Sequence, residues 1–86
     1  MGYCFYTFRS ITRGQLALRA LQAENLRASL LRTPRALATE GCGYAIRVRE
    51  DDCAAAERVF ARSGVQFQRR FVERNGQYRE LRGGGL

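Results

Sequence analysis

The sequence predicts one small α+β domain whose elements follow the order β-α-β-β-α-β. Three observations point to this class. The chain has 86 residues, which is enough for one domain and too few for two. Two segments carry apolar residues at helical spacing, and strand-like segments lie on both sides of each. Glycine, proline and asparagine stand between these segments, where turns are expected.

The first half of the chain predicts a strand, a helix and a second strand. Residues 3–8 are mostly aromatic or β-branched and apolar on both faces, which is typical of a central strand. Ser10 and Thr12 are candidate N-caps for the helix that follows, and we place the end of that helix at Asn25. Residues 26–32 predict the second strand, which Pro34 terminates.

The second half repeats this pattern. Residues 44–49 alternate between polar and apolar side chains, as a half-exposed strand does. Asp51 and Asp52 predict the start of a second helix, and Gly64 predicts its left-handed end. Residues 65–72 predict a fourth strand, which completes the expected sheet.

We assign residues 1–74 to the single α+β domain and separate residues 75–86 from it. Asn75-Gly76 predicts a tight turn, after which residues 77–81 can fold back as a short edge strand. The glycine-rich end is expected to be a flexible tail.

Two β-α-β halves in one short chain predict a ferredoxin-like fold. Its sheet would be antiparallel, with two helices on one face. The opposite face would stay polar or need a partner, which makes a homo-oligomer through the sheet one expectation.

The composition excludes several kinds of chemistry. All fifteen basic residues are Arg, the net charge is +7, and the chain has no His and no Lys. The usual general base, the commonest metal ligand and the Schiff-base amine are therefore missing. The positive charge suits an anionic partner such as nucleic acid, but a coding bias toward Arg explains it equally well.

The three cysteines are Cys4, Cys42 and Cys53, and their spacing forms neither a zinc motif nor a dithiol redox motif. Their odd number, without a signal peptide, predicts a reducing compartment and a cytoplasmic location. No apolar stretch is long enough to cross a membrane, so we expect no membrane partner.

Cys42 is the candidate reactive thiol. It lies between Gly41 and Gly43, just before a predicted strand, and small neighbours allow another molecule to approach closely. Arg35 and Arg47 bracket this loop and would favour the thiolate, which is the nucleophilic form. The alternative is that the segment is an ordinary turn with a small residue.

The chain resembles a family of small selenium/sulfur carrier-like domains. The resemblance lies in Phe8-Arg9-Ser10, in Pro34-Arg35 after the second strand, and in Cys42-Gly43 before an apolar strand. It implies that Cys42 accepts a sulfur or selenium atom as a persulfide or selenenylsulfide and passes it to an acceptor protein. It also implies donor and acceptor protein partners, no metal or other cofactor, and a carrier rather than a turnover enzyme.

Two alternatives remain open from the sequence. The first is a ligand-sensing or oligomerisation module that needs no reactive cysteine. The second is a basic RNA-binding domain, because aromatic residues on a central strand can stack bases. The aromatics in question are Tyr3, Phe5, Tyr6 and Phe8.

Overall fold

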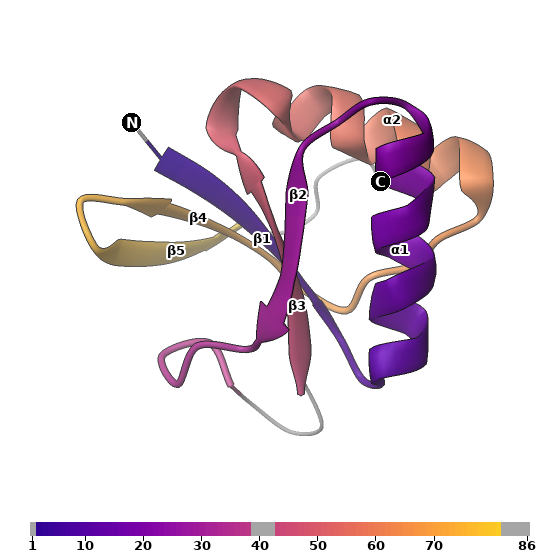
Figure 1. Cartoon of the computed structure of the whole chain (residues 1–86). Helices are drawn as coiled ribbons and strands as arrows, with labels where there is room; N and C mark the ends of the chain where they lie inside the picture. The colour runs from indigo at the N-terminus through magenta and orange to yellow at the C-terminus, as the bar shows by residue number, and fades with distance from the viewer. Residues whose placement is uncertain (1, 39–42, 82–86) are drawn as a thin grey trace.

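Five strands form one antiparallel sheet in the computed structural model, which describes residues 2–38 and 43–81 (Figure 1). In chain order the elements are β1 (Gly2–Phe8), α1 (Ile11–Ala23), β2 (Ala28–Arg32), β3 (Tyr44–Arg49), a 3₁₀ turn (Glu50–Asp52), α2 (Cys53–Ser63), β4 (Arg70–Arg74) and β5 (Gln77–Leu81). The strands lie side by side in the order β2-β3-β1-β4-β5. The apolar strand β1 is therefore central, as its composition predicts.

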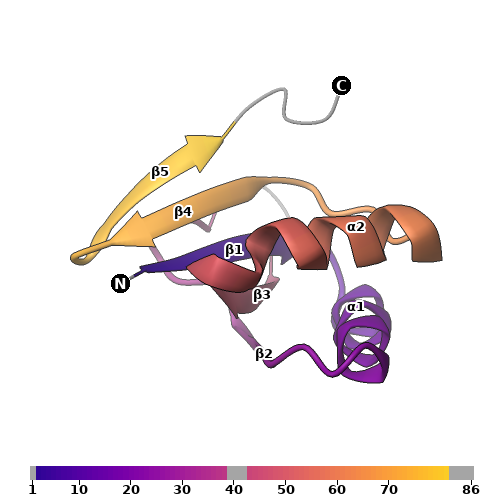
Figure 2. The same ribbon diagram turned by 90° about the horizontal axis from the view of Figure 1, so that it is seen from above.

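The predicted α+β class, the antiparallel sheet and the two helices are confirmed, but the exact four-stranded ferredoxin-like sheet is not matched. A fifth strand is present because the chain reverses at Asn75-Gly76, where both residues have positive φ (54° and 79°), and β5 then pairs along β4. This hairpin lies on the other side of β1 from α1 in both Figure 1 and Figure 2. The division of the chain at residue 74 stays a prediction.

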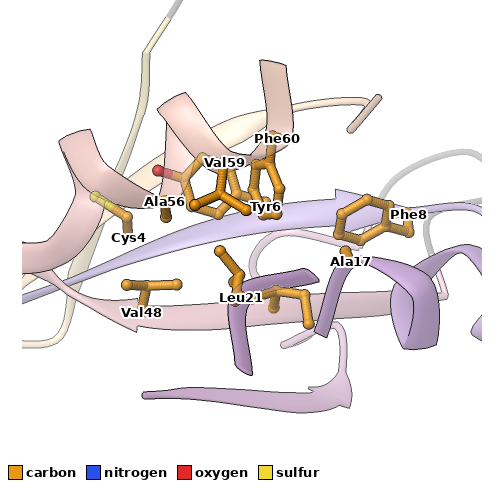
Figure 3. Packing of buried hydrophobic residues seen from close by; sticks show 10 residues of the cluster. Cys4, Tyr6, Phe8, Ala17, Leu21, Val48, Ala56, Val59 and Phe60 are labelled. Carbon is orange, nitrogen blue, oxygen red and sulfur yellow. The ribbon is translucent and has the colours of Figure 1, made fainter. Parts of the chain in front are cut away.

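Both helices pack on the same face of the sheet, which we call the helix face. Figure 3 shows most of its buried cluster, including alternate residues of β1. The cluster contains Cys4, Tyr6, Phe8, Ala17, Leu21, Ile46, Val48, Ala56, Val59 and Phe60. At its centre the Tyr6 ring meets the Phe60 ring edge to face, with 5.2 Å between centroids. Such ring pairs contribute about 0.5–1.5 kcal/mol to stability beyond the area they bury.

The helix ends follow the predicted signals in part. The Ser10 side chain accepts a hydrogen bond from the Arg13 amide at the start of α1. Gly64 has φ 72° and ends α2 in the left-handed conformation, as predicted. The start of α2 differs, because a 3₁₀ turn comes first and Asp52 makes no side-chain capping hydrogen bond.

The predicted fourth strand over residues 65–72 begins later than expected. The strand is β4, and the preceding segment is an irregular connection whose Val65 and Phe67 pack against the helix-face cluster. The alternating apolar residues of this segment resemble a strand pattern, but their side chains fill the end of the core. Thr7 holds this connection to β1 through backbone hydrogen bonds with Gln68 and Arg69.

The opposite face, which we call the loop face, is neither bare nor polar. Phe5, Ala45 and Phe71 form a second buried cluster there together with Leu37. Leu37 belongs to the connection between β2 and β3, and only 2% of it is exposed. The chain therefore covers part of this face with its own loop, an arrangement the sequence analysis did not anticipate.

Candidate functional site

The connection from β2 to β3 carries the predicted site, and the structure defines it from both ends. Cys42, Gly41 and Glu40 lie outside the described residues, so the predictions for Cys42 and Gly41 stay predictions. The described frame consists of residues 33–38 on one side and Gly43 on the other. What this frame fixes is where the cysteine-bearing segment leaves the sheet and where it returns.

A tight turn anchors the first end of the frame. The amides of Leu37 and Ala38 both donate hydrogen bonds to the Pro34 carbonyl, at 2.8 and 3.0 Å. This turn directs the Leu37 side chain down onto the loop-face cluster. The entry to the cysteine-bearing segment is thus attached to the core by one buried side chain.

The ladder between β2 and β3 anchors the second end. Its last register pair is Arg32 with Tyr44, and one further hydrogen bond runs from the Thr33 amide to the Gly43 carbonyl at 3.1 Å. A Cβ atom at position 43 would meet only the Arg9 carbonyl oxygen, at 3.9 Å. No close contact within the described residues therefore requires glycine at position 43. The space that a side chain would fill there is open to another molecule.

The two predicted anion-stabilising arginines occupy different places. Arg35 is exposed within the turn. Arg47 lies on the loop face two residues beyond Ala45, and its guanidinium carbon sits 4.8 Å from the centre of the Tyr3 ring. A cation over an aromatic ring is held by the electron-rich ring face. Among the described residues Arg47 is thus engaged with Tyr3, and its action on Cys42 stays a prediction.

Sequence reasoning missed three further residues at this end of the sheet. Arg9 follows β1, Arg32 ends β2 with its guanidinium 5.5 Å from the centre of the Tyr44 ring, and Thr33 follows it. The Thr33 hydroxyl oxygen is buried without a hydrogen-bond partner among the described residues. The strand order is the signal that could have found them, because β3 begins between the ends of β1 and β2.

The family comparison can now be set beside this geometry. A family model described as "Putative Se/S carrier protein-like" matches residues 3–71, a span that runs from β1 into β4 and includes the cysteine-bearing segment. The chain belongs to this family. No curated protein and no solved structure matches it.

The other two cysteines of this Se/S carrier-like chain are joined to each other. Cys4 in β1 and Cys53 at the start of α2 form a disulfide with their Cα atoms 6.2 Å apart. No pairing of these two residues was predicted from the sequence. The pair could not be predicted from the sequence because the two cysteines are 49 positions apart and meet only where α2 packs over β1.

The predicted cytoplasmic location stays a prediction, and the disulfide does not favour it, since disulfides are rare in the cytosol. Within residues 2–38 and 43–81, no helix has the length and apolar character needed to span a membrane.

Two titratable side chains of this Se/S carrier-like chain, Tyr6 and Glu50, have shifted pKa values. Burial, followed by the hydrogen bond that its hydroxyl donates to Glu57 at 2.8 Å, raises the pKa of Tyr6 well above its usual value. Arg70 bonds the same carboxylate at 2.6 Å. Near the disulfide, the hydrogen bond from Arg74 lowers the pKa of the half-buried Glu50. Neither group faces the described frame of Cys42.

The aromatic platform considered for RNA binding is divided between the two faces. Tyr6 and Phe8 point to the helix face and are buried, and Phe5 is buried on the loop face. Only Tyr3 is half-exposed. Because base stacking needs exposed rings on one surface, these four residues do not form the expected platform.

Proposed function

We propose that this chain carries sulfur or selenium between proteins, with the cargo atom bound to Cys42. The observation that supports this most is the family match, since it spans the cysteine-bearing segment and the family is named for carriers of these two elements. The chain would act as a relay and not as a turnover enzyme.

The transfer is a thiolate exchange. The Cys42 thiolate attacks the outer sulfur of a donor protein persulfide, a new S–S bond forms on Cys42, and the donor leaves as a thiolate. The acceptor thiolate then repeats the step on the outer sulfur of the Cys42 persulfide. Each step breaks one S–S bond and forms another, so no external oxidant or reductant is consumed. With selenium, the atom that moves is held in a selenenylsulfide.

The frame around the segment supports this role. Leu37 is buried on the loop face before the segment, and the Gly43 carbonyl accepts a hydrogen bond from the Thr33 amide after it. Arg9, Arg32 and Arg35 all lie at that end. Positive groups favour a thiolate or persulfide anion over its protonated form, which speeds the exchange at neutral pH. Gly41 and Gly43 would give a donor protein room to approach.

The test loads the protein with sulfur and weighs it intact. A Cys4→Ser/Cys53→Ser double variant retains only Cys42, and Cys42→Ser retains only the disulfide pair. After incubation with a cysteine desulfurase and cysteine, or with polysulfide as a chemical donor, we expect one added sulfur atom on the double variant and none on Cys42→Ser. Equal loading of both proteins, or none on the double variant with either donor, would contradict the proposal.

A further inference from the structure

The disulfide is open to solvent through a hollow on the helix face. Both Cys4 and Cys53 line this hollow, which has a volume of about 600 Å³ and lies between the start of α2 and the β4–β5 hairpin. Figure 3 shows the Cys4 side chain among the helix-face residues of β1.

The two sulfur-bearing residues are unequal. Cys4 lies in the middle of the sheet and is only 4% exposed, whereas Cys53 is partly exposed and is the first residue of α2. The start of a helix carries partial positive charge, which favours a thiolate at Cys53 once the bond opens. The preceding carboxylates of Asp51 and Asp52 oppose this effect, whereas Arg74 pairs with that of Glu50. The pair thus combines one accessible, ionisable sulfur with one sheltered sulfur.

We propose that Cys4 and Cys53 form a second thiol site, a redox-active pair that exchanges with small thiols through this hollow. The site is independent of the carrier role proposed for Cys42. In the first step an external thiolate attacks the Cys53 sulfur and forms a mixed disulfide, and Cys4 leaves as a thiolate that takes a proton from water. A second external thiolate attacks the outer sulfur of the mixed disulfide and releases Cys53. The protein gains two electrons, and two external thiols become one disulfide.

The lining of the hollow indicates the class of thiol. Its volume falls in the range of small-molecule pockets. Val72 and Leu81 contribute apolar surface, and Arg74 and Arg79 lie at its edge. Arg74 is bonded to Glu50, but no carboxylate within residues 2–38 and 43–81 pairs with Arg79. A small thiol that carries carboxylates, such as glutathione, fits this surface better than a neutral one.

The first experiment uses the folded Cys42→Ser protein, in which the pair supplies the only sulfur atoms able to exchange. The protein is placed in glutathione buffers of increasing reducing strength without denaturant, quenched with an alkylating reagent and weighed intact. We expect reversible conversion between the disulfide and the doubly alkylated dithiol while circular dichroism shows a folded chain. A disulfide that resists excess thiol in the folded protein and opens only when urea unfolds it would overturn the proposal.

The second experiment asks which sulfur exchanges. Cys4→Ser/Cys42→Ser retains Cys53 alone, and Cys53→Ser/Cys42→Ser retains Cys4 alone. We expect the lone Cys53 to form a mixed disulfide with oxidised glutathione about tenfold faster than the lone Cys4. Equal rates, or a faster Cys4, would overturn the assignment of Cys53. If either variant does not fold, trapping the mixed disulfide during reduction of Cys42→Ser and locating it by peptide mass gives the same decision.

The third experiment tests the ligand class on the Cys42→Ser protein. Arg79→Glu should slow reduction by glutathione about threefold and slow reduction by 2-mercaptoethanol less, because both attack as thiolates but only glutathione also carries carboxylates. Arg19→Glu makes the same charge change at an exposed position of α1 outside the hollow and should alter neither rate. Equal effects of the two substitutions on glutathione would overturn the assignment of Arg79.

Discussion

The two faces of the sheet differ in how they are covered. Within residues 2–38 and 43–81, the helix face has ten buried residues in one cluster, supplied by strands and both helices. The loop face has four in the same part of the chain, and one of these, Leu37, comes from the connection that leads to Cys42. Neighbouring residues of β1 therefore belong to different clusters, since Tyr6 packs under the helices and Phe5 packs under the loop.

This difference separates stability from presentation of the thiol. The large cluster on the helix face holds the fold, whereas the small cluster on the loop face anchors the turn after Pro34 through Leu37. The thiols follow the same division, because Cys4 and Cys53 lie on the helix face and the segment with Cys42 continues from the turn on the loop face. Substitutions on the two faces should accordingly have different consequences.

The largest effect is expected from Phe60→Ala on the helix face. Phe60 is 2% exposed and its ring contacts those of Tyr6, Phe8 and Phe67. Removing it leaves a cavity among these rings, and we expect the free energy of unfolding in urea to fall by about 3–5 kcal/mol. At low temperature, where the variant is still folded, sulfur loading of Cys42 should persist. A loss below about 1 kcal/mol would show that the helix face is not the main source of stability.

Leu37→Ala should have a smaller effect on stability and a larger one on function. We expect a loss of about 2–3 kcal/mol, because the side chain is buried but its loop can partly collapse into the space. Sulfur loading should fall even where the variant is fully folded, since the turn loses its anchor. Leu16→Ala is the matched control, because Leu16 is 56% exposed and should change neither quantity. Unchanged loading in a folded Leu37→Ala protein would break the proposed link between the loop face and the thiol.

The same division explains what could be predicted from the sequence. Helical spacing, the left-handed Gly64 and the Asn75-Gly76 turn report local physics, and each is borne out. The pairing of Cys4 with Cys53 and the burial of Leu37 depend on segments that meet only after folding. Leu37 stands alone among small and polar residues, so no periodicity marks it as part of a core.

Of the candidate site, the sequence predicted only the residues of the short motif around Cys42. Cys42 and Arg35 were singled out from a short stretch of sequence, whereas the approach of Arg9 and Arg32 to the same end of the sheet follows from the strand order. Alternation over residues 65–72 predicted a strand where Val65 and Phe67 instead fill the core. A period of two indicates which side chains are buried and does not by itself require a sheet.

Tyr6→Phe tests a polar contact on the helix face. Its hydroxyl donates a hydrogen bond to Glu57, and bonds to charged groups contribute more than neutral ones, so we expect a loss of about 1.5–2 kcal/mol at pH 7. The raised pKa means that the folded protein keeps this proton after the unfolded chain has begun to lose it near pH 10. The stabilising contribution is therefore complete below that pH and decreases above it. Urea titrations at pH 7 and 10.5 should show the difference between wild type and variant shrinking by about 0.8 kcal/mol, and a constant difference would contradict this.

The smallest effect, and the one of opposite sign, is expected from Thr33→Val at the base of the loop. The hydroxyl oxygen is buried with no partner among the described residues, so a methyl group of similar size avoids the cost of desolvating it. The backbone hydrogen bond from Thr33 to Gly43 remains, and we expect a gain of up to about 1 kcal/mol in urea unfolding. Thr12→Val, at an exposed position of α1, makes the same chemical change and should alter stability little. A loss of stability in Thr33→Val would instead show that the hydroxyl makes a favourable contact, and it would contradict this prediction.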